Sequence, residues 1–196
     1  MQEVFYEESA ILENRKPEIR KYNMFNVFSF VSLTLGLLWC VMAVYFYQFK
    51  GDILLNIVAL ALPLSGFIVS GIVFGRFKNR FCIDYDYTFI TGSVRFSKVI
   101  KNVKRQKVLE FDTQSIEVIG RYDSEKYKRF KTMPGIKKLI LTSNLEPQEG
   151  KDLYYLVVAT SGQKYLLILE CTETFISHLI RFSSRTAPED GFFKKK

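Results

Sequence analysis

The most informative shortage in this 196-residue sequence is a local shortage of charge. Residues 25–75 contain only two charged side chains, Lys50 and Asp52, whereas the other 145 residues carry the remaining 46. A helix that is apolar on every side is stable only deep inside a large protein or inside a membrane. The overall content of 48% apolar residues is therefore an average over two kinds of segment, one suited to lipid and the other suited to water. This distribution argues against one fully soluble globule and against a disordered chain.

Cysteine and histidine are also scarce, which excludes most metal and nucleophile chemistry. The three cysteines, Cys40, Cys82 and Cys171, are too few and too far apart for a zinc site or a disulfide-stapled secreted module. The single histidine, His178, would have to serve any Ser-His-Asp or Cys-His arrangement. No Walker-type or dinucleotide-type glycine loop occurs. We therefore expect no enzymatic activity, no metal and no cofactor.

Two uncharged runs inside the charge-poor block are long enough to cross a bilayer. They comprise residues 25–49 and 53–75, and a transmembrane helix needs about 20 apolar residues. Because only three residues separate them, residues 25–75 predict a tight transmembrane helical hairpin. A cleaved signal peptide fits poorly, since the first run begins late, is too long and is followed at once by a second. Two core helices of a soluble protein are the alternative.

The charges that flank these runs predict their orientation. Seven basic residues lie on the outer flanks, whereas the turn between the runs holds Lys50 alone. The positive-inside rule then places both termini and the C-terminal domain in the cytoplasm, with residues 48–52 outside. We expect a two-span protein of the cell membrane. The flanking residues are Arg15, Lys16, Arg20, Lys21, Arg76, Lys78 and Arg80.

Small residues recur at helical spacing along both predicted spans. In lipid, small side chains let two helix backbones approach closely, and this packing drives association. The helix faces lined by these small residues either pack the two helices of the hairpin against each other, which we favour, or bind a partner helix. No charged residue lies at bilayer depth, which argues against an ion or proton pathway. The predicted packing residues are Ser32, Gly36, Cys40, Gly66, Ser70, Gly71 and Gly75.

Residues 80–185 predict one small domain of seven strands and a final helix. The strands are expected at residues 81–90, 93–100, 103–111, 115–121, 137–142, 153–159 and 164–170, bounded by turn residues. Residues 172–184 predict an amphipathic helix with Thr172 as its cap. Residues 1–24 are expected to be a cytosolic segment that forms a short helix or stays disordered, and residues 186–196 a flexible basic tail.

The order of these elements resembles that of a pleckstrin-homology-like (PH-like) barrel. Residues 85–88, Gly92 and residues 116–119 (Tyr-Asp-Tyr-Thr, then Ile-Glu-Val-Ile) are similar to the pattern of bacterial PH-like domains, which often follow a pair of membrane spans. The resemblance implies two bent sheets that form a seven-stranded barrel, a C-terminal helix that plugs one end, and a binding role. The long connection over residues 121–136 departs from this pattern. Another small β-barrel or sandwich is the alternative fold.

The net charge of +8 gathers in this domain. Residues 76–196 carry +9, mostly from residues 95–107 and 121–138. In an up-and-down meander, these two segments would share the end of the barrel at which the chain leaves the membrane. We expect that end to dock on anionic headgroups, at roughly 1 kcal/mol per basic group; a solvated basic surface is the alternative. The expected lipid-facing residues are Arg76, Lys78, Arg80, Lys101, Lys104, Arg105, Lys126, Lys128, Arg129 and Lys131.

The sequence thus predicts a membrane-anchored binding or scaffold module that docks on anionic lipid headgroups or on a protein partner. The second hypothesis is an accessory subunit of a larger membrane complex that acts through its helical hairpin. The third is a hydrolase or transferase that uses Asp84, Asp86 and His178, although on an alternating strand the two acids are expected to face solvent. Nucleic acid is a poor partner, because the basic runs lack interleaved aromatic residues.

Overall fold

The protein is described from a computed structural model, which covers residues 3–46, 53–183 and 187–188. The chain divides into two compact units, one made of Asn14–Cys82 and the other of Met1–Glu13 together with Ile83–Lys196. The predicted outer turn and nearly all of the predicted tail lie outside the described residues. Each unit is taken by itself below.

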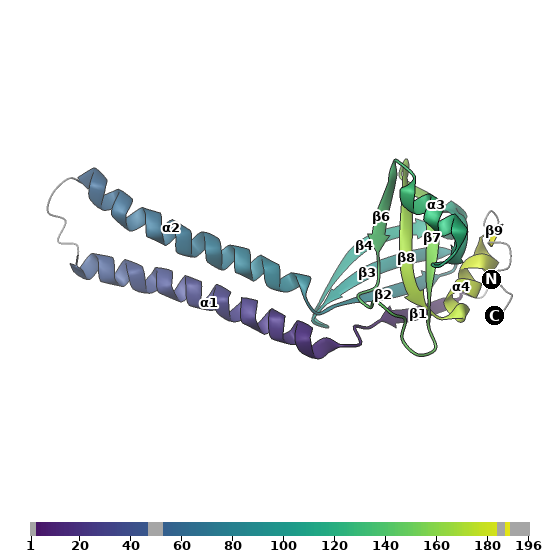
Figure 1. Cartoon of the computed structure of the whole chain (residues 1–196), viewed down its shortest axis with the longest axis horizontal. Coiled ribbons are helices and arrows are strands. Elements are labelled where there is room, and N and C mark those ends of the chain that lie inside the picture. Colours follow the sequence, from purple (N-terminus) through teal and green to yellow (C-terminus); the bar gives the residue numbers. More distant parts are fainter. Residues whose placement is uncertain (1–2, 47–52, 184–186, 189–196) are drawn as a thin grey trace. The chain divides into compact units, whose positions relative to one another are not determined.

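The first unit is a pair of long helices that form a hairpin (Figure 1). Helix α1 runs over Arg15–Phe46 and α2 over Ile53–Phe77, and the 3₁₀ turn η1 follows at Lys78–Arg80. Both helices are long and apolar enough to span a membrane. Large side chains such as Phe30 and Leu62 are 71% and 69% exposed, which suits contact with lipid rather than with water.

The second unit is assembled from two stretches of chain that flank the hairpin in sequence. Strand β1 (Phe5–Ala10) pairs antiparallel with β2 (Ile83–Ile90), so the helical hairpin is an insertion between two paired strands. The prediction that residues 1–24 form a short helix or remain disordered is wrong. Residues 5–10 are a strand whose last residue, Ala10, is buried, and the charged residues from Arg15 onward are the first turns of α1.

The first sheet has the strand order β1-β2-β3-β4, with β3 at Ser93–Ile100 and β4 at Lys104–Asp112. Its inner face contributes Tyr87 and Phe89 to the main core. A register shift between Phe96 and Ser97 interrupts the β3–β4 ladder, and such a bulge increases the bend and twist of a sheet.

The second sheet has the order β6-β8-β7-β5, with a two-residue strand β9 beside β5. Its bounds are Ile116–Arg121 for β5, Ile136–Ile140 for β6, Asp152–Thr160 for β7, Gln163–Cys171 for β8 and Ala187–Pro188 for β9. The turn η2 (Thr113–Ser115) joins β4 to β5. Both sheets contribute to the main core, but no strand pairing joins them within the described residues, so a closed barrel is not seen.

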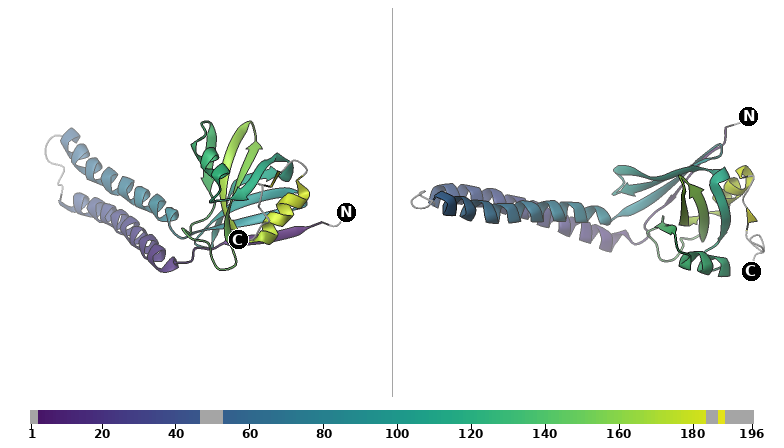
Figure 2. Two further views of the ribbon diagram at one scale, coloured as in Figure 1. Left: turned by 45° about the vertical axis from the view of Figure 1, so that its right-hand side comes forward. Right: turned by 90° about the horizontal axis from the view of Figure 1, so that it is seen from above.

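The strands do not follow the up-and-down order that the charge prediction assumed. Strand β6 pairs parallel with β8, and both β5 and β8 pair antiparallel with β7. Strands β5 and β6 therefore run in the same direction, and a connection between them must cross the sheet. Helix α3 (Glu125–Thr132) makes this crossing over the outer face of the second sheet (Figure 2). Tyr127 of α3 is buried there in a second apolar cluster with Tyr155 and Leu166.

Helix α4 (Glu173–Phe182) is the C-terminal helix that the sequence predicts. The Thr172 hydroxyl accepts a hydrogen bond from the Phe175 backbone N–H at 3.4 Å, which confirms the predicted cap. Its apolar face is buried in the main core through Phe175, Ile176 and Leu179. All seven predicted strands are present as β2–β8, each with its ends within two residues of the expected positions.

Candidate functional site

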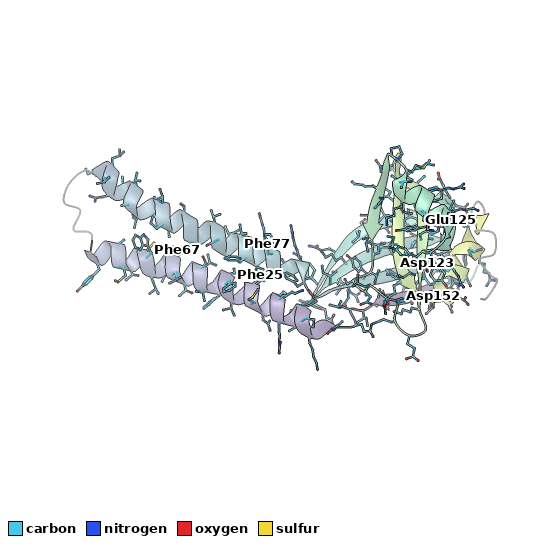
Figure 3. All side chains as sticks on the ribbon, viewed as in Figure 1. Phe25, Phe67, Phe77, Asp123, Glu125 and Asp152 are labelled. Atoms are coloured by element: carbon cyan, nitrogen blue, oxygen red, sulfur yellow. The ribbon has the colours of Figure 1, made fainter. Side chains whose placement is uncertain are left out.

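One end of the helical hairpin is built from aromatic rings. Phe25 of α1 stacks on Phe81 with the ring centroids 5.4 Å apart, and it contacts Phe74 and Phe77 at 6.1 Å. Figure 3 shows Phe25 and Phe77 side by side on the two helices. The guanidinium of Arg80 lies 4.6 Å from the centre of the Phe77 ring. Aromatic rings and cations at the ends of apolar helices are typical of a membrane–water interface.

The three predicted lipid-facing residues of this unit lie at the same end. Arg76 is exposed in the last turn of α2, where a positive charge also interacts favourably with the helix dipole. Lys78 donates a hydrogen bond from Nζ to Asn26 Oδ1 at 2.8 Å, and its Nζ lies 5.8 Å from the centre of the Tyr22 ring. Together with Arg80, these residues surround the aromatic rings with positive charge.

Small residues hold the two helices of the hairpin together. The Ser29 hydroxyl donates to the Gly71 carbonyl at 2.7 Å, and the Ser32 hydroxyl donates to the Phe67 carbonyl at 2.9 Å and pairs with the Ser70 hydroxyl. A side-chain Cβ at Gly71 would lie only 2.7 Å from Leu33 of α1. The polar groups and the close approach thus serve the hairpin itself.

The other predicted packing residues divide into two groups. A Cβ at Gly36 would lie 3.1 Å from Phe67 Cβ, and one at Gly75 would lie 3.2 Å from the Ser29 hydroxyl. Gly66, in contrast, would meet nothing within 4 Å, so it does not lie in the hairpin interface. Cys40 is a partly buried free thiol.

The turn between β3 and β4 is an exposed basic tip of the domain. Lys101 and Asn102 both have positive φ, at 51° and 58°, and the Val103 backbone N–H donates to the Ile100 carbonyl at 3.1 Å, as in a type I′ turn. Val103 follows and is 85% exposed. Lys104 and Arg105, at the start of β4, are exposed as well. The tip thus presents an apolar side chain between basic ones.

The position of this tip follows from the strand register. Ile100, the last residue of β3, lies opposite Ile83, the first residue of β2. The tip therefore projects from the end of the sheet at which the chain arrives from α2. Cys82, just before β2, has φ 55° and is buried, so the chain bends there.

The second predicted basic segment lies elsewhere on the domain. Lys126, Lys128, Arg129 and Lys131 are exposed on α3, which covers the outer face of the second sheet and lies apart from the β3–β4 turn in both views (Figures 1 and 2). The expectation that the two basic segments share one end of the domain is wrong. The parallel pairing of β6 with β8 turns the expected end loop into a crossing helix.

The two acids of β2 lie on the outer face of the first sheet but are buried, contrary to the expectation of a solvent face. Asp84 accepts a hydrogen bond from the Leu12 backbone N–H at 2.8 Å. Asp86 accepts one from the Ser9 hydroxyl at 2.7 Å and lies 3.2 Å from the guanidinium of Arg105. Asp84 therefore fastens the segment after β1 to β2, and Asp86 fastens both β1 and β4 to it.

A shallow polar hollow of about 450 Å³ lies beside Asp86 on this face. Its three cations already lie beside acids of the same face, since Arg95 and Lys107 both pair with Glu110, Arg105 pairs with Asp86, and Glu7 supplies a third negative charge to the lining. The lining residues are Glu7, Asp86, Thr88, Arg95, Ser97, Arg105 and Lys107. This internal pairing makes the hollow a poor anion site.

His178 lies on the other side of the first sheet from the two acids. Its ring is 5.2 Å from Tyr6 and 5.8 Å from Phe89, which belongs to the main core. The structure therefore does not bring His178 together with Asp84 and Asp86. Within the described part of the chain, no group of three His, Cys, Asp or Glu side chains could hold a metal ion.

The comparison with protein families decides the classification of this fold. A family model described as a bacterial PH-like domain (DUF6106) matches residues 20–188. The chain belongs to this family. No curated protein and no solved structure matches the chain. The match includes the helical hairpin as well as β2–β8, so the two long helices are part of the pattern that defines this PH-like family.

Two features of this PH-like domain were not predicted from the sequence. Strand β1 precedes the matched range, and its only local signal was a short run of apolar and polar residues. Val103 was expected to be the first residue of the strand over residues 103–111, although its place directly after Asn102, a residue that tolerates positive φ, could have marked it as part of a turn.

Proposed function

We propose that this PH-like protein is a membrane-anchored binding module whose cytosolic domain docks on anionic lipid headgroups through the β3–β4 tip. In this proposal both termini are cytoplasmic and the chain is not an enzyme. One observation carries the proposal: Val103 is 85% exposed between Lys101 and Lys104. An apolar side chain flanked by cations suits the boundary between headgroups and acyl chains.

The covalent chain supports this role for the tip. Only Phe81 and Cys82 separate η1 from β2, a distance of at most about 10 Å from Arg80 to Ile83. Because Ile100 is paired with Ile83, the tip lies at the end of the first sheet that directly follows this short connection. Phe81 itself belongs to the ring cluster around Phe25, which we place at the membrane surface.

The charge of this region is large enough for docking. Lys101, Lys104 and the basic residues around the ring cluster, namely Arg76, Lys78 and Arg80, would all lie near the surface. Each contributes roughly 1 kcal/mol near an anionic leaflet, and the attraction falls off over about 8 Å at physiological salt. Several such groups together supply more binding free energy than the domain, which is already tethered, loses in orientational entropy when it docks.

Depth-dependent fluorescence quenching in the full chain tests the proposal. Trp39 is the only tryptophan, so a Trp39→Phe, Val103→Trp variant reports from the tip alone. In bilayers that contain anionic and brominated lipids we expect strong quenching, which decreases when Lys101 and Lys104 are replaced by Glu. Equal quenching in neutral and anionic bilayers, or none in either, would overturn the proposal.

The matched control is a charge reversal on α3. Lys126→Glu with Lys131→Glu makes the same change in net charge at exposed positions on the outer face of the second sheet. We expect the quenching of the tryptophan introduced at the tip to stay the same in this background. If the α3 variant lowered it as much as the tip variant, docking would depend on overall charge rather than on the tip.

A further inference from the structure

The outer face of the first sheet carries two neighbouring rows of polar side chains that cross all four strands. The rows follow from the strand register, because residues directly opposite each other lie on the same face of a sheet. The hollow beside Asp86 lies over these rows, where the short side chains of Thr88 and Ser97 stand between longer ones. From β1 to β4, the first row is Glu7, Thr88, Arg95 and Glu110, and the second is Ser9, Asp86, Ser97 and Lys107.

The strands separate the charges of this hollow by sign. Its two acids, Glu7 and Asp86, come from β1 and β2, whereas its three cations come from β3 and β4. Glu110 pairs with two of these cations, so the basic side keeps an excess of positive charge. A ligand that carries both a positive and a negative group can align with this arrangement, whereas a simple anion meets cations that are already paired.

The β-bulge between β3 and β4 turns one of the cations into the hollow. The register shift places Lys107 opposite Ser97 and leaves Val108 as the extra residue. In a regular ladder Val108 would lie opposite Ser97 on the outer face, and Lys107 would point inward. Instead Val108 packs against the main core and Lys107 lines the hollow. Bulges often re-aim a side chain in this way next to a functional site.

The two acids of the hollow lack a complete set of partners. Asp86 is buried, and its Oδ2 accepts no hydrogen bond within the described residues. The guanidinium of Arg105 lies 3.2 Å from this oxygen without forming a hydrogen bond, on a side chain that is 69% exposed. Glu7, on the neighbouring strand, has no ion partner in the described part of the chain. A buried acceptor without a donor is unfavourable, and a donor from a ligand would remove this cost.

We propose that the hollow binds a small zwitterion that carries a primary ammonium and a phosphate, the chemistry of phosphoethanolamine. The ammonium lies between Glu7 and Asp86, and it donates one of its three N–H groups to Asp86 Oδ2. The phosphate lies at the basic side, where it accepts hydrogen bonds from Lys107 and from Arg105, which turns away from Asp86 when the ammonium replaces it.

Phosphate suits the basic side better than a carboxylate does. A phosphate monoester carries a charge of about −1.5 to −2 at neutral pH, and three cations stand there against Glu110 alone. Two of the three are arginines, Arg95 and Arg105, whose planar guanidinium groups bind phosphate oxygens in pairs. The same zwitterion exists as a free molecule and as the headgroup of a phospholipid, so the test includes both sources.

Calorimetric titration of the full chain in detergent micelles, in a buffer without phosphate, compares the zwitterion with its parts. We expect phosphoethanolamine to bind about tenfold or more tightly than inorganic phosphate or ethanolamine, because each part lacks the charge-assisted hydrogen bonds of the other. Phosphocholine, whose ammonium has no N–H group, should bind as weakly as inorganic phosphate. Equal binding of phosphoethanolamine and inorganic phosphate, or no binding of either, overturns the proposal.

A short-chain phosphatidylethanolamine, with short-chain phosphatidylcholine as its control, distinguishes the two sources. If the ethanolamine lipid binds more tightly than free phosphoethanolamine, the hollow recognises a headgroup; if it binds more weakly, the hollow takes the free molecule. Both results support the assigned chemistry. Equal binding of the two lipids together with no binding of phosphoethanolamine contradicts it. The hollow shares no residue with the headgroup docking at the β3–β4 tip, so failure of either proposal leaves the other standing.

Two substitutions locate the charges of the ligand. Glu7→Gln should weaken phosphoethanolamine binding about tenfold without weakening that of inorganic phosphate, whereas Lys107→Met should weaken both. The matched controls are Glu149→Gln and Lys131→Met, which remove the same charges at exposed positions outside the hollow and should bind like wild type. All four variants should keep the wild-type thermal midpoint, because these side chains are exposed. If each hollow variant binds like its control, the assigned site is wrong.

Discussion

Asn144, in the loop between β6 and β7, donates a hydrogen bond of 2.8 Å from Nδ2 to the backbone carbonyl of Ile11, directly after β1. The same side chain accepts one from the Glu13 backbone N–H at 3.0 Å, and Gln148 Nε2 also donates to the Ile11 carbonyl at 2.8 Å. The helical hairpin separates these partners in sequence. The loop therefore joins the two stretches of chain from which the PH-like domain is built.

This bridge predicts a stability defect for Asn144→Ala. The substitution removes a donor from the buried carboxylate of Glu170 and frees the segment after β1. A buried acceptor that loses its partner costs about 1–3 kcal/mol, so we expect a loss of this size in urea unfolding of the domain, followed by near-UV circular dichroism. Leu145→Ser, at the neighbouring exposed position, is the control and should be neutral. Equal stability of the two variants would contradict the bridge.

The discontinuous domain predicts that residues 80–196 do not fold well alone. Without residues 1–13 the domain loses β1 and exposes the edge of β2. It also loses Glu8, whose carboxylate accepts two hydrogen bonds of 2.9 Å from Thr172 at the start of α4. We expect poor NMR dispersion or aggregation of the shortened chain.

A linked version of the domain is the matched comparison. The Leu12 backbone N–H lies 2.8 Å from Asp84 Oδ1, so a few Gly and Ser residues can join residue 13 to residue 83 in place of the hairpin. This chain should give a dispersed spectrum and a cooperative thermal transition. Equal behaviour of the two chains would show that β1 is dispensable.

Local signals account for what the sequence predicted, and long-range pairing for what it did not. Strands β2–β8 and α4 were found because alternation and turn residues are local, and Thr172 caps α4 as expected. Strand β1 was missed because its partner β2 follows only after the inserted hairpin. The two basic segments were correctly assigned to the domain, but their separation depends on the pairing of β6 with β8, which no local pattern encodes.

The pair of cations around Glu110 predicts a pH dependence. Arg95 and Lys107 donate hydrogen bonds to this carboxylate at 2.7 and 3.0 Å, and they hold the pKa of Glu110 below its usual value. A carboxyl whose pKa is lower in the folded state stabilises the fold above its unfolded pKa, and this contribution is lost as the pH falls through the folded value. The contribution should be small, because all three side chains are partly exposed.

An NMR titration of the Glu110 carboxyl carbon checks this sign. In Arg95→Met we expect the midpoint to move up toward the ordinary glutamate value, since one hydrogen-bond donor to the carboxylate is gone. The melting temperature of this variant should approach that of the wild type at acidic pH, because Glu110 is then protonated in both proteins and no longer attracts a cation. A midpoint that did not move would mean that Arg95 does not interact with Glu110 in solution.

The hairpin interface predicts opposite outcomes for two glycines of α2. At Gly71 a Cβ would lie 2.7 Å from both Cγ and Cδ2 of Leu33, whereas at Gly66 it would meet nothing within 4 Å. Gly71→Val and Gly66→Val make the same change in side chain and in helix propensity. We expect the first to destabilise the hairpin by about 1–3 kcal/mol through overpacking and the second to change it little. Unfolding of the full chain by a denaturing detergent in bicelles measures both.

The same pair of variants distinguishes the two roles considered for the small-residue faces. If they only close the hairpin, Gly71→Val separates the helices and Gly66→Val has no effect on any association of the chain. If the open face around Gly66 binds a partner helix, Gly66→Val leaves the hairpin intact but lowers association within the membrane. Because the Ser29 hydroxyl bonds to the Gly71 carbonyl and the Ser32 hydroxyl to the Phe67 carbonyl inside the hairpin, we expect the first outcome. A loss of association in Gly66→Val alone would contradict it.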